Sequence, residues 1–141
     1  MACTLRAVGF LLEVGLPAIP AAAQTCPWMN AATAGGVLGG DVTATVTPDA
    51  CTFVRPGAEL LIAVQPVVRK VDASHAATCG PDPAPLKAIG NEAVICTAGR
   101  TVRVVGRVRD KIFTITLTSA KPETFREKAR AVAEQVAGNL F

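Results

Sequence analysis

Aromatic side chains are scarce in this chain: among its 141 residues there is no tyrosine, one tryptophan and five phenylalanines. Domains that bind single-stranded nucleic acid stack the bases on aromatic side chains, and nucleic-acid-binding domains in general carry a strongly basic face. Here charged residues make up 18% of the chain, and the formal net charge is only +3. The sequence therefore predicts no specific nucleic acid partner.

Histidine and serine are also rare. After residue 23 the only serines are Ser74 and Ser119, and the single histidine of the chain, His75, adjoins Ser74. Adjacent side chains rarely converge on one reacting atom, so a Ser–His nucleophile is not expected. The chain also lacks a CxxC pair, which thiol redox chemistry and many structural zinc sites use. We expect no enzyme activity, no cofactor and no metal.

An uninterrupted apolar run long enough for a membrane span is missing too. Arg6 precedes an apolar stretch from Val8 to Ala23 that closes on three alanines, which is the pattern of a cleavable signal peptide. This stretch has about 16 residues, contains a glutamate and two prolines, and is too short to cross a hydrocarbon core of ~30 Å as a helix. We predict a signal peptide over residues 1–23, no transmembrane segment, and an extracytoplasmic location, either periplasmic or secreted.

Hydrophobic residues, in contrast, make up 50% of the chain, which is enough to form a core of mainly aliphatic side chains. Removal of the signal peptide takes away Arg6 and Glu13, so the net charge stays at +3. A chain of this length normally forms one domain. We expect residues 24–141 to fold as a single domain.

Four cysteines follow the signal peptide, and an even number in an exported chain indicates two disulfides. They are Cys26, Cys51, Cys79 and Cys96. Of the three possible pairings we favour Cys26 with Cys51 and Cys79 with Cys96, because each bridge closes a loop within one half of the chain. Each would stabilise the fold by ~3 kcal/mol. A lipid on Cys26 is the alternative, although the Gln-Thr pair before this cysteine differs from the small residue that lipid attachment usually needs.

Alternating apolar and polar residues predict a set of β-strands. The expected strands are residues 42–46, 51–55, 59–68 and 92–97, followed by a hairpin over 101–119. The stretch 59–68 holds an unbroken apolar run, which predicts a strand that is covered on both faces. In the hairpin, a two-residue turn at Asp110 and Lys111 places Val108 opposite Phe113 and sorts the apolar side chains onto one face.

Two helices are expected at opposite ends of the domain. Pro27 suits a first helical turn, and Gly39 with Gly40 provides a stop signal, so a short helix should lie between them. From about 122 to 140, apolar residues recur at spacings of three and four, which predicts an amphipathic helix packed on the sheet. Binding to a membrane surface is disfavoured because the polar face of this helix has mixed charges. Together the elements predict an α+β fold with one antiparallel sheet packed against both helices.

Four short motifs follow one another along the chain: Cys-Pro-Trp-Met-Asn at 26–30, Leu-Gly-Gly-Asp-Val at 38–42, Cys-Thr-Phe at 51–53 and Gly-Asn-Glu-Ala-Val at 90–94. With the hairpin and the terminal helix, this order resembles a family of small exported bacterial proteins and lipoproteins of unknown function. The resemblance implies an α+β fold with an antiparallel sheet and an extracytoplasmic location. It implies no activity.

Arginines on the expected hairpin are the main functional lead. Arg103, Arg107 and Arg109 lie two and four residues apart, so they would share the outward face of one strand. Guanidinium groups bind carboxylates and phosphates, which predicts contact with an anionic envelope component or an unknown protein; the alternative is a solvated face that resists aggregation. We expect an exported, non-catalytic interaction or ligand-binding domain. A secreted hydrolase inhibitor, presenting the loop at 78–86, is the alternative function.

Overall fold

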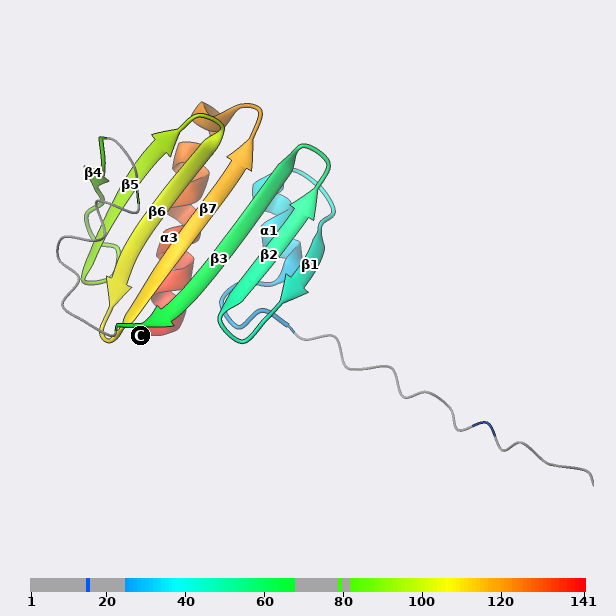
Figure 1. Ribbon diagram of the computed structural model, residues 1–141, viewed down its shortest axis with the longest axis horizontal. Helices are drawn as coiled ribbons and strands as arrows, with labels where there is room; N and C mark the ends of the chain where they lie inside the picture. The colour runs from blue at the N-terminus through cyan, green and yellow to red at the C-terminus, as the bar shows by residue number, and fades with distance from the viewer. Residues whose placement is uncertain (1–14, 16–24, 68–78, 80–81) are drawn as a thin grey trace, which may run out of the picture.

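A computed structural model describes residue 15, residues 25–67, residue 79 and residues 82–141, and the predicted signal peptide over 1–23 lies outside these residues apart from residue 15. In the described part, one antiparallel sheet has the strand order β1-β2-β3-β7-β6-β5-β4 (Figure 1). The strands are β1 Thr43–Val46, β2 Ala50–Arg55, β3 Ala58–Pro66, β4 Ala84–Pro85, β5 Glu92–Ala98, β6 Thr101–Val108 and β7 Lys111–Ser119. The helices are α1 Ala31–Leu38, the 3-10 turn η1 Pro122–Phe125 and α3 Arg126–Leu140. The predicted α+β fold is confirmed.

Two three-stranded meanders meet at the middle of the sheet. The first runs β1-β2-β3, the second runs β5-β6-β7, and β3 pairs with β7 along its whole length. In that pairing Leu60 lies opposite Leu117 and Ile62 lies opposite Ile115. These four aliphatic side chains lie on one face and are almost wholly buried, so they join the two halves of the chain into one hydrophobic core.

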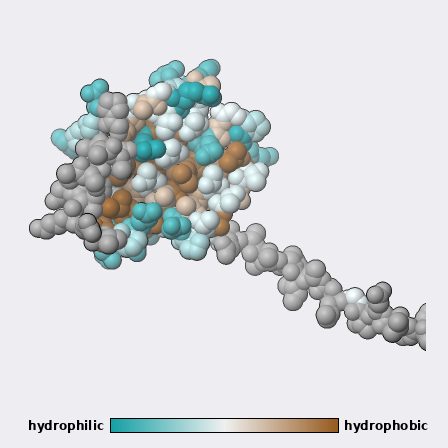
Figure 2. Space-filling model, in the orientation of Figure 1, coloured by the Kyte–Doolittle hydropathy of each residue, from teal (hydrophilic) through white to brown (hydrophobic). Residues whose placement is uncertain are grey.

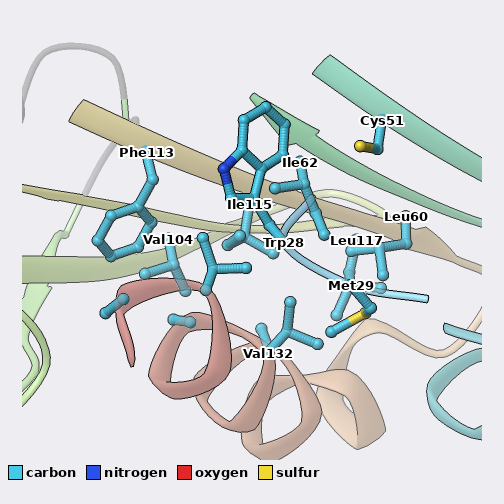
Figure 3. Close-up of a cluster of buried hydrophobic side chains, with 14 of the residues drawn as sticks. Trp28, Met29, Cys51, Leu60, Ile62, Val104, Phe113, Ile115, Leu117 and Val132 are labelled. Carbon is cyan, nitrogen blue, oxygen red and sulfur yellow. The ribbon is translucent and has the colours of Figure 1, made fainter. Parts of the chain in front are cut away.

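Both helices cover this same face, which we call the helix face (Figure 1). The amphipathic helix α3 buries a stripe that contains Ala129, Val132 and Val136, as its spacing predicts. Figure 3 shows Trp28 and Met29, from the segment before α1, among the buried side chains of the sheet and α3. Burial of a large aliphatic or aromatic side chain contributes about 1.5–3 kcal/mol, so this layer supplies most of the hydrophobic stabilisation.

The short helix α1 is terminated by polar and glycine caps. Oδ1 of Asn30 accepts a hydrogen bond of 2.8 Å from the amide of Thr33, which satisfies one free donor of the first turn. At the other end Gly39 adopts φ 90°, and its amide donates to the carbonyl of Gly35. The expected short helix is therefore present, and it begins at Ala31 rather than at Pro27.

The hairpin β6–β7 forms with a register that differs by two residues from the expected one. Phe113 lies opposite Gly106 instead of Val108, and the turn is at Arg109 and Asp110. The reason is packing: the Phe113 ring lies over Gly106 so closely that a Cβ at this position would collide with it. Because the shift is even, every side chain keeps its predicted face.

Among the described residues, β3 is covered on one face only, so the prediction of a strand buried on both faces is wrong. Leu60, Ile62 and Val64 are buried, whereas Leu61 and Ala63 are half-buried. An unbroken apolar run does not distinguish a strand between two layers from one beneath a single layer. As a result, aliphatic side chains reach the second face of the sheet, which the helices leave open.

Candidate binding surface

The two predicted disulfides are both formed, and they lie on opposite faces of the sheet. Cys26 bonds to Cys51 and ties the segment before α1 to the helix face of β2. Cys79 bonds to Cys96 on the second face, which we call the open face. The bond to Cys51 leaves no free thiol on Cys26 for attachment of a lipid.

Strand register determines which side chains meet on the open face. Leu61 of β3 lies opposite Thr52 of β2 on one side and opposite Thr116 of β7 on the other. Two residues further along β3, Ala63 lies opposite Thr114. Successive side chains of a strand alternate between faces, so these residues share the open face with Val54. We call this set the open patch: Thr52, Val54, Leu61, Ala63, Thr114 and Thr116.

The open patch is accessible and has no charged member, although Glu59 and Arg103 border it, opposite Val54 and Thr116. Val54 is 42% exposed, and the other members are half-buried. Figure 2 shows this side of the molecule, with apolar and weakly polar residues lying among charged ones. The threonines offer a methyl group and a hydroxyl group each, and no member carries a titratable side chain. Such a surface suits contact with another molecule and provides no acid, base or nucleophile for catalysis.

The neighbouring part of the open face is covered. Over β5 and β6, the alternation of burial breaks at Cys96 and Val105, which are 1% and 3% exposed although they lie on the open face. They form a second hydrophobic cluster with Cys79, against which Val94 and Ile112 pack. The Cys79–Cys96 bridge thus caps one half of this face, while the open patch over β2, β3 and β7 stays accessible.

Of the three arginines predicted to share a surface, two lie on the open face. Arg103 lies opposite Thr116, and Arg107 lies opposite Ile112. Nε of Arg107 is 3.2 Å from Oε1 of Glu92 on the adjacent strand β5. This ion pair is half exposed and already provides an anion for the guanidinium group. It therefore reduces the attraction of this side chain for an external anion.

Arg109 lies apart from the other two, in the hairpin turn. Its backbone has φ 54°, and its amide donates a 2.6 Å hydrogen bond to Oδ1 of Asn91. Nη1 of Arg107 donates to the Arg109 carbonyl at 3.1 Å, which further fixes the turn. The Arg109 guanidinium group lies 5.8 Å from the centre of the Phe141 ring, at the end of the chain after α3. The structure thus does not bring the three arginines together on one face.

The loop expected at 78–86 is partly a strand. Ala84 lies opposite Ile95 and Pro85 lies opposite Val94, and the amide of Leu86 donates to the carbonyl of Ala93 at 2.9 Å. This part of the segment is docked on the edge of the sheet. A projecting inhibitory loop would have to be formed by the residues before it, so the hydrolase inhibitor stays a prediction.

The open patch is not evident from the sequence, because the unbroken apolar run of β3 predicts a cover on both faces of this strand. One signal in the sequence pointed to this surface: threonine alternates with apolar residues along Thr114–Thr118, which indicates a half-buried strand. Leu61 lies opposite Thr116 of this strand, so the Leu61 side chain shares a face with half-buried threonines and is not covered by a second layer of helices or strands. Finding this pairing requires knowing that β3 lies beside β7, which local patterns do not show.

Two kinds of site are absent from the described residues. No group of three or more His, Cys, Asp or Glu side chains is placed to hold a metal ion, and no helix there has the length and apolar character needed to cross a membrane. His75 and Ser74 lie outside the described residues. No protein-family model, no curated protein and no solved structure matches this chain.

Proposed function

We propose that this protein is an exported, non-catalytic binding domain that holds a partner protein on its open patch. One observation carries the proposal. Along β3 and β7 every second side chain is buried beneath the helices, while Leu61, Thr114 and Thr116 stay half-buried on the other face. A seven-stranded sheet with a helix layer behind it presents these side chains with little freedom to rearrange, which lowers the entropic cost of binding.

The chemistry of the patch favours a partner surface that is uncharged and partly aliphatic. Burial of a charge at the centre of the patch, against Leu61 and Ala63, would remove it from water without an opposite charge beside it, which is costly. Leu61, Ala63 and Val54 can bury methyl groups, and the surrounding threonines can exchange hydrogen bonds with a polar rim. An anionic envelope component is less favoured because Arg107 is paired with Glu92.

Export is supported by the disulfides. Bridges such as Cys26–Cys51 and Cys79–Cys96 form and persist in oxidising compartments and are rare in reducing ones. The N-terminal stretch with the pattern of a signal peptide points to the same location.

A site-specific crosslinking experiment tests the binding surface. Leu61 and Thr116 are replaced, one at a time, by a photoreactive phenylalanine analogue in the cells that produce the protein, with Ala131 on the exposed side of α3 as the control position. We expect the same partner protein to crosslink from positions 61 and 116 and not from position 131. Equal crosslinking from position 131, or none from the patch, would refute the proposed surface.

A binding measurement with the captured partner separates the two partner classes. Thr116→Lys places a charge at the middle of the patch and should weaken binding at least ~10-fold, whereas Ala131→Lys should leave it unchanged. The pair Arg103→Gln and Arg107→Gln should have a smaller effect than Thr116→Lys. If the arginine variant loses binding while Thr116→Lys retains it, the partner is anionic and the proposal in its present form is wrong.

A further inference from the structure

The two edges of the sheet differ in how they are protected against further strand pairing. The edge strand β4 has two residues, one of them Pro85, and proline cannot donate a backbone hydrogen bond. The other edge strand, β1, has four residues, none of which is charged, and Thr43, Ala44 and Thr45 are all exposed. Proteins usually blunt such an edge with a proline, a charge or a bulge. Apart from its length of four residues, β1 contains none of these devices.

The hydrogen-bonding pattern of the β1–β2 hairpin shows which backbone groups of β1 face outward. The amide of Thr47 donates to the carbonyl of Ala50 at 2.8 Å, so this pair is hydrogen-bonded across the hairpin. Hydrogen-bonded pairs alternate along an antiparallel ladder, so Thr45 and Thr43 also bond toward β2. The amide and carbonyl groups of Ala44 and Val46 therefore point away from the sheet, and the same alternation, continued one residue before the strand, turns those of Val42 outward as well.

The sequence around this edge reads the same in both directions: Val42-Thr43-Ala44-Thr45-Val46. A palindromic strand can pair antiparallel with a second copy about a two-fold axis through its centre, with each residue opposite an identical one. Here Ala44 would lie opposite Ala44 of the second copy, Thr43 opposite Thr45, and Val42 opposite Val46. The outward groups at 42, 44 and 46 then exchange about six backbone hydrogen bonds.

Charge is also compatible with this register. The first charged residue before the strand, Asp41, falls opposite Thr47 of the second copy. Asp41 of the two copies therefore stands at opposite ends of the seam, about 20 Å apart at the rise of an extended strand. No like charges face each other, and the two threonine pairs lie together on the open face.

Access to the edge is unobstructed in the described part of the chain. A shallow hollow of about 680 Å³ lies beside the start of β1, and its lining from α1 consists of small residues such as Ala32 and Gly36. A Cβ at Gly36 would meet no atom within 4 Å. A second strand can therefore approach without moving the helix.

From these observations we propose that two copies of the protein associate by antiparallel pairing of their β1 strands. The two-fold axis is perpendicular to the sheet, so both open patches face the same side and form one longer surface. A seam of five residues buries less than the roughly 1,200 Å² of a standard interface, so the dimer is weak, with a Kd of about 0.1–1 mM. The proposal does not depend on the proposed binding function.

Sedimentation equilibrium on the oxidised protein between about 10 µM and 1 mM tests the association. The average mass should rise toward that of two chains at the upper end of this range. Ala44→Lys places two like charges face to face across the seam and should keep the protein monomeric. Ala98→Lys, the same change at an exposed position of β5, should behave as the parent. A monomer at every concentration, or a dimer that Ala44→Lys leaves intact, would overturn the proposal.

Disulfide trapping tests the register. In the proposed seam the two Ala44 Cα atoms are about 5.5 Å apart, which suits a disulfide, so Ala44→Cys should give a covalent dimer on mild oxidation. Thr47→Cys is the control, because position 47 is exposed, lies opposite position 41 of the second copy, and is six residues away from its own counterpart. Equal trapping from both variants would exclude the palindromic register. Intact mass with peptide mapping verifies that the native bridges are retained.

Discussion

The two faces of the sheet differ in how deeply they bury neighbouring residues of the same strands. On the helix face, Leu60 and Ile115 are fully buried beneath α1 and α3. On the open face, Leu61 and Thr116, each one position further along, are only half-buried. The helix face therefore carries most of the stability, while the open patch can change with little effect on folding. If the open patch is the proposed binding surface, this separation allows it to vary on a constant core.

The disulfides show the same contrast, and their removal should have the largest effects. Replacing Cys26 and Cys51 by alanine opens a loop of 25 residues and removes sulfur from the main core, so we expect a loss of about 4 kcal/mol. Replacing Cys79 and Cys96 opens a loop of 17 residues and should cost about 3 kcal/mol. Urea unfolding of both double variants and the oxidised parent measures these free energies.

The second double variant also tests the capped half of the open face. Without the bridge, Val105 should become more accessible, because Cys79 and Cys96 form its cluster. Hydrogen exchange of β5 and β6 should increase while that of β3 stays as in the parent. A larger loss of stability from the Cys79–Cys96 pair than from the Cys26–Cys51 pair would reverse the ranking of the two faces.

Two adjacent leucines on β3, one on each face of the sheet, give the sharpest test of the difference between the helix face and the open face. Leu60→Ala leaves a cavity in the main core and should lower the free energy of unfolding by about 3 kcal/mol. Leu61→Ala removes the same atoms from a half-buried position and should cost less than about 1 kcal/mol. Chemical denaturation of the two variants, which differ by one position, makes the measurement. Equal losses would mean that the open face is packed as tightly as the helix face.

Local patterns in the sequence predicted most of the framework because the elements that they describe are stabilised locally. The alternation along Thr114–Thr118, the helical spacing of α3 and the glycine stop after Leu38 each have a physical basis within a few residues. The disulfide pairing was predictable because each bridge joins segments that are close in the chain.

Features that depend on distant contacts were not predictable in this way. The turn at Arg109 is unfavourable by local propensity, since φ 54° is uncommon for a residue with a side chain. Asn91, 18 residues away, stabilises it by accepting the hydrogen bond from the Arg109 amide. Likewise, the half exposure of Leu61 follows from the position of β3 beside β7, with both helices on one side. The candidate surface depends on these long-range relations, so only its threonines were visible in the sequence.

The ion pair between Arg107 and Glu92 should give the smallest effect. Its side chains are 37% and 45% exposed, and pairs in such positions contribute about 0–1 kcal/mol because water and salt screen the attraction. We expect a coupling energy of about 0.5 kcal/mol in a double-mutant cycle of Arg107→Ala and Glu92→Ala, measured by urea unfolding. The coupling should fall further in high salt. A coupling of several kcal/mol would instead show that this ion pair contributes substantially to the stability of the sheet. A weak coupling means that Glu92 balances the charge of Arg107 beside the open patch while adding almost nothing to the stability of the sheet, so both charges can be removed together without unfolding the protein.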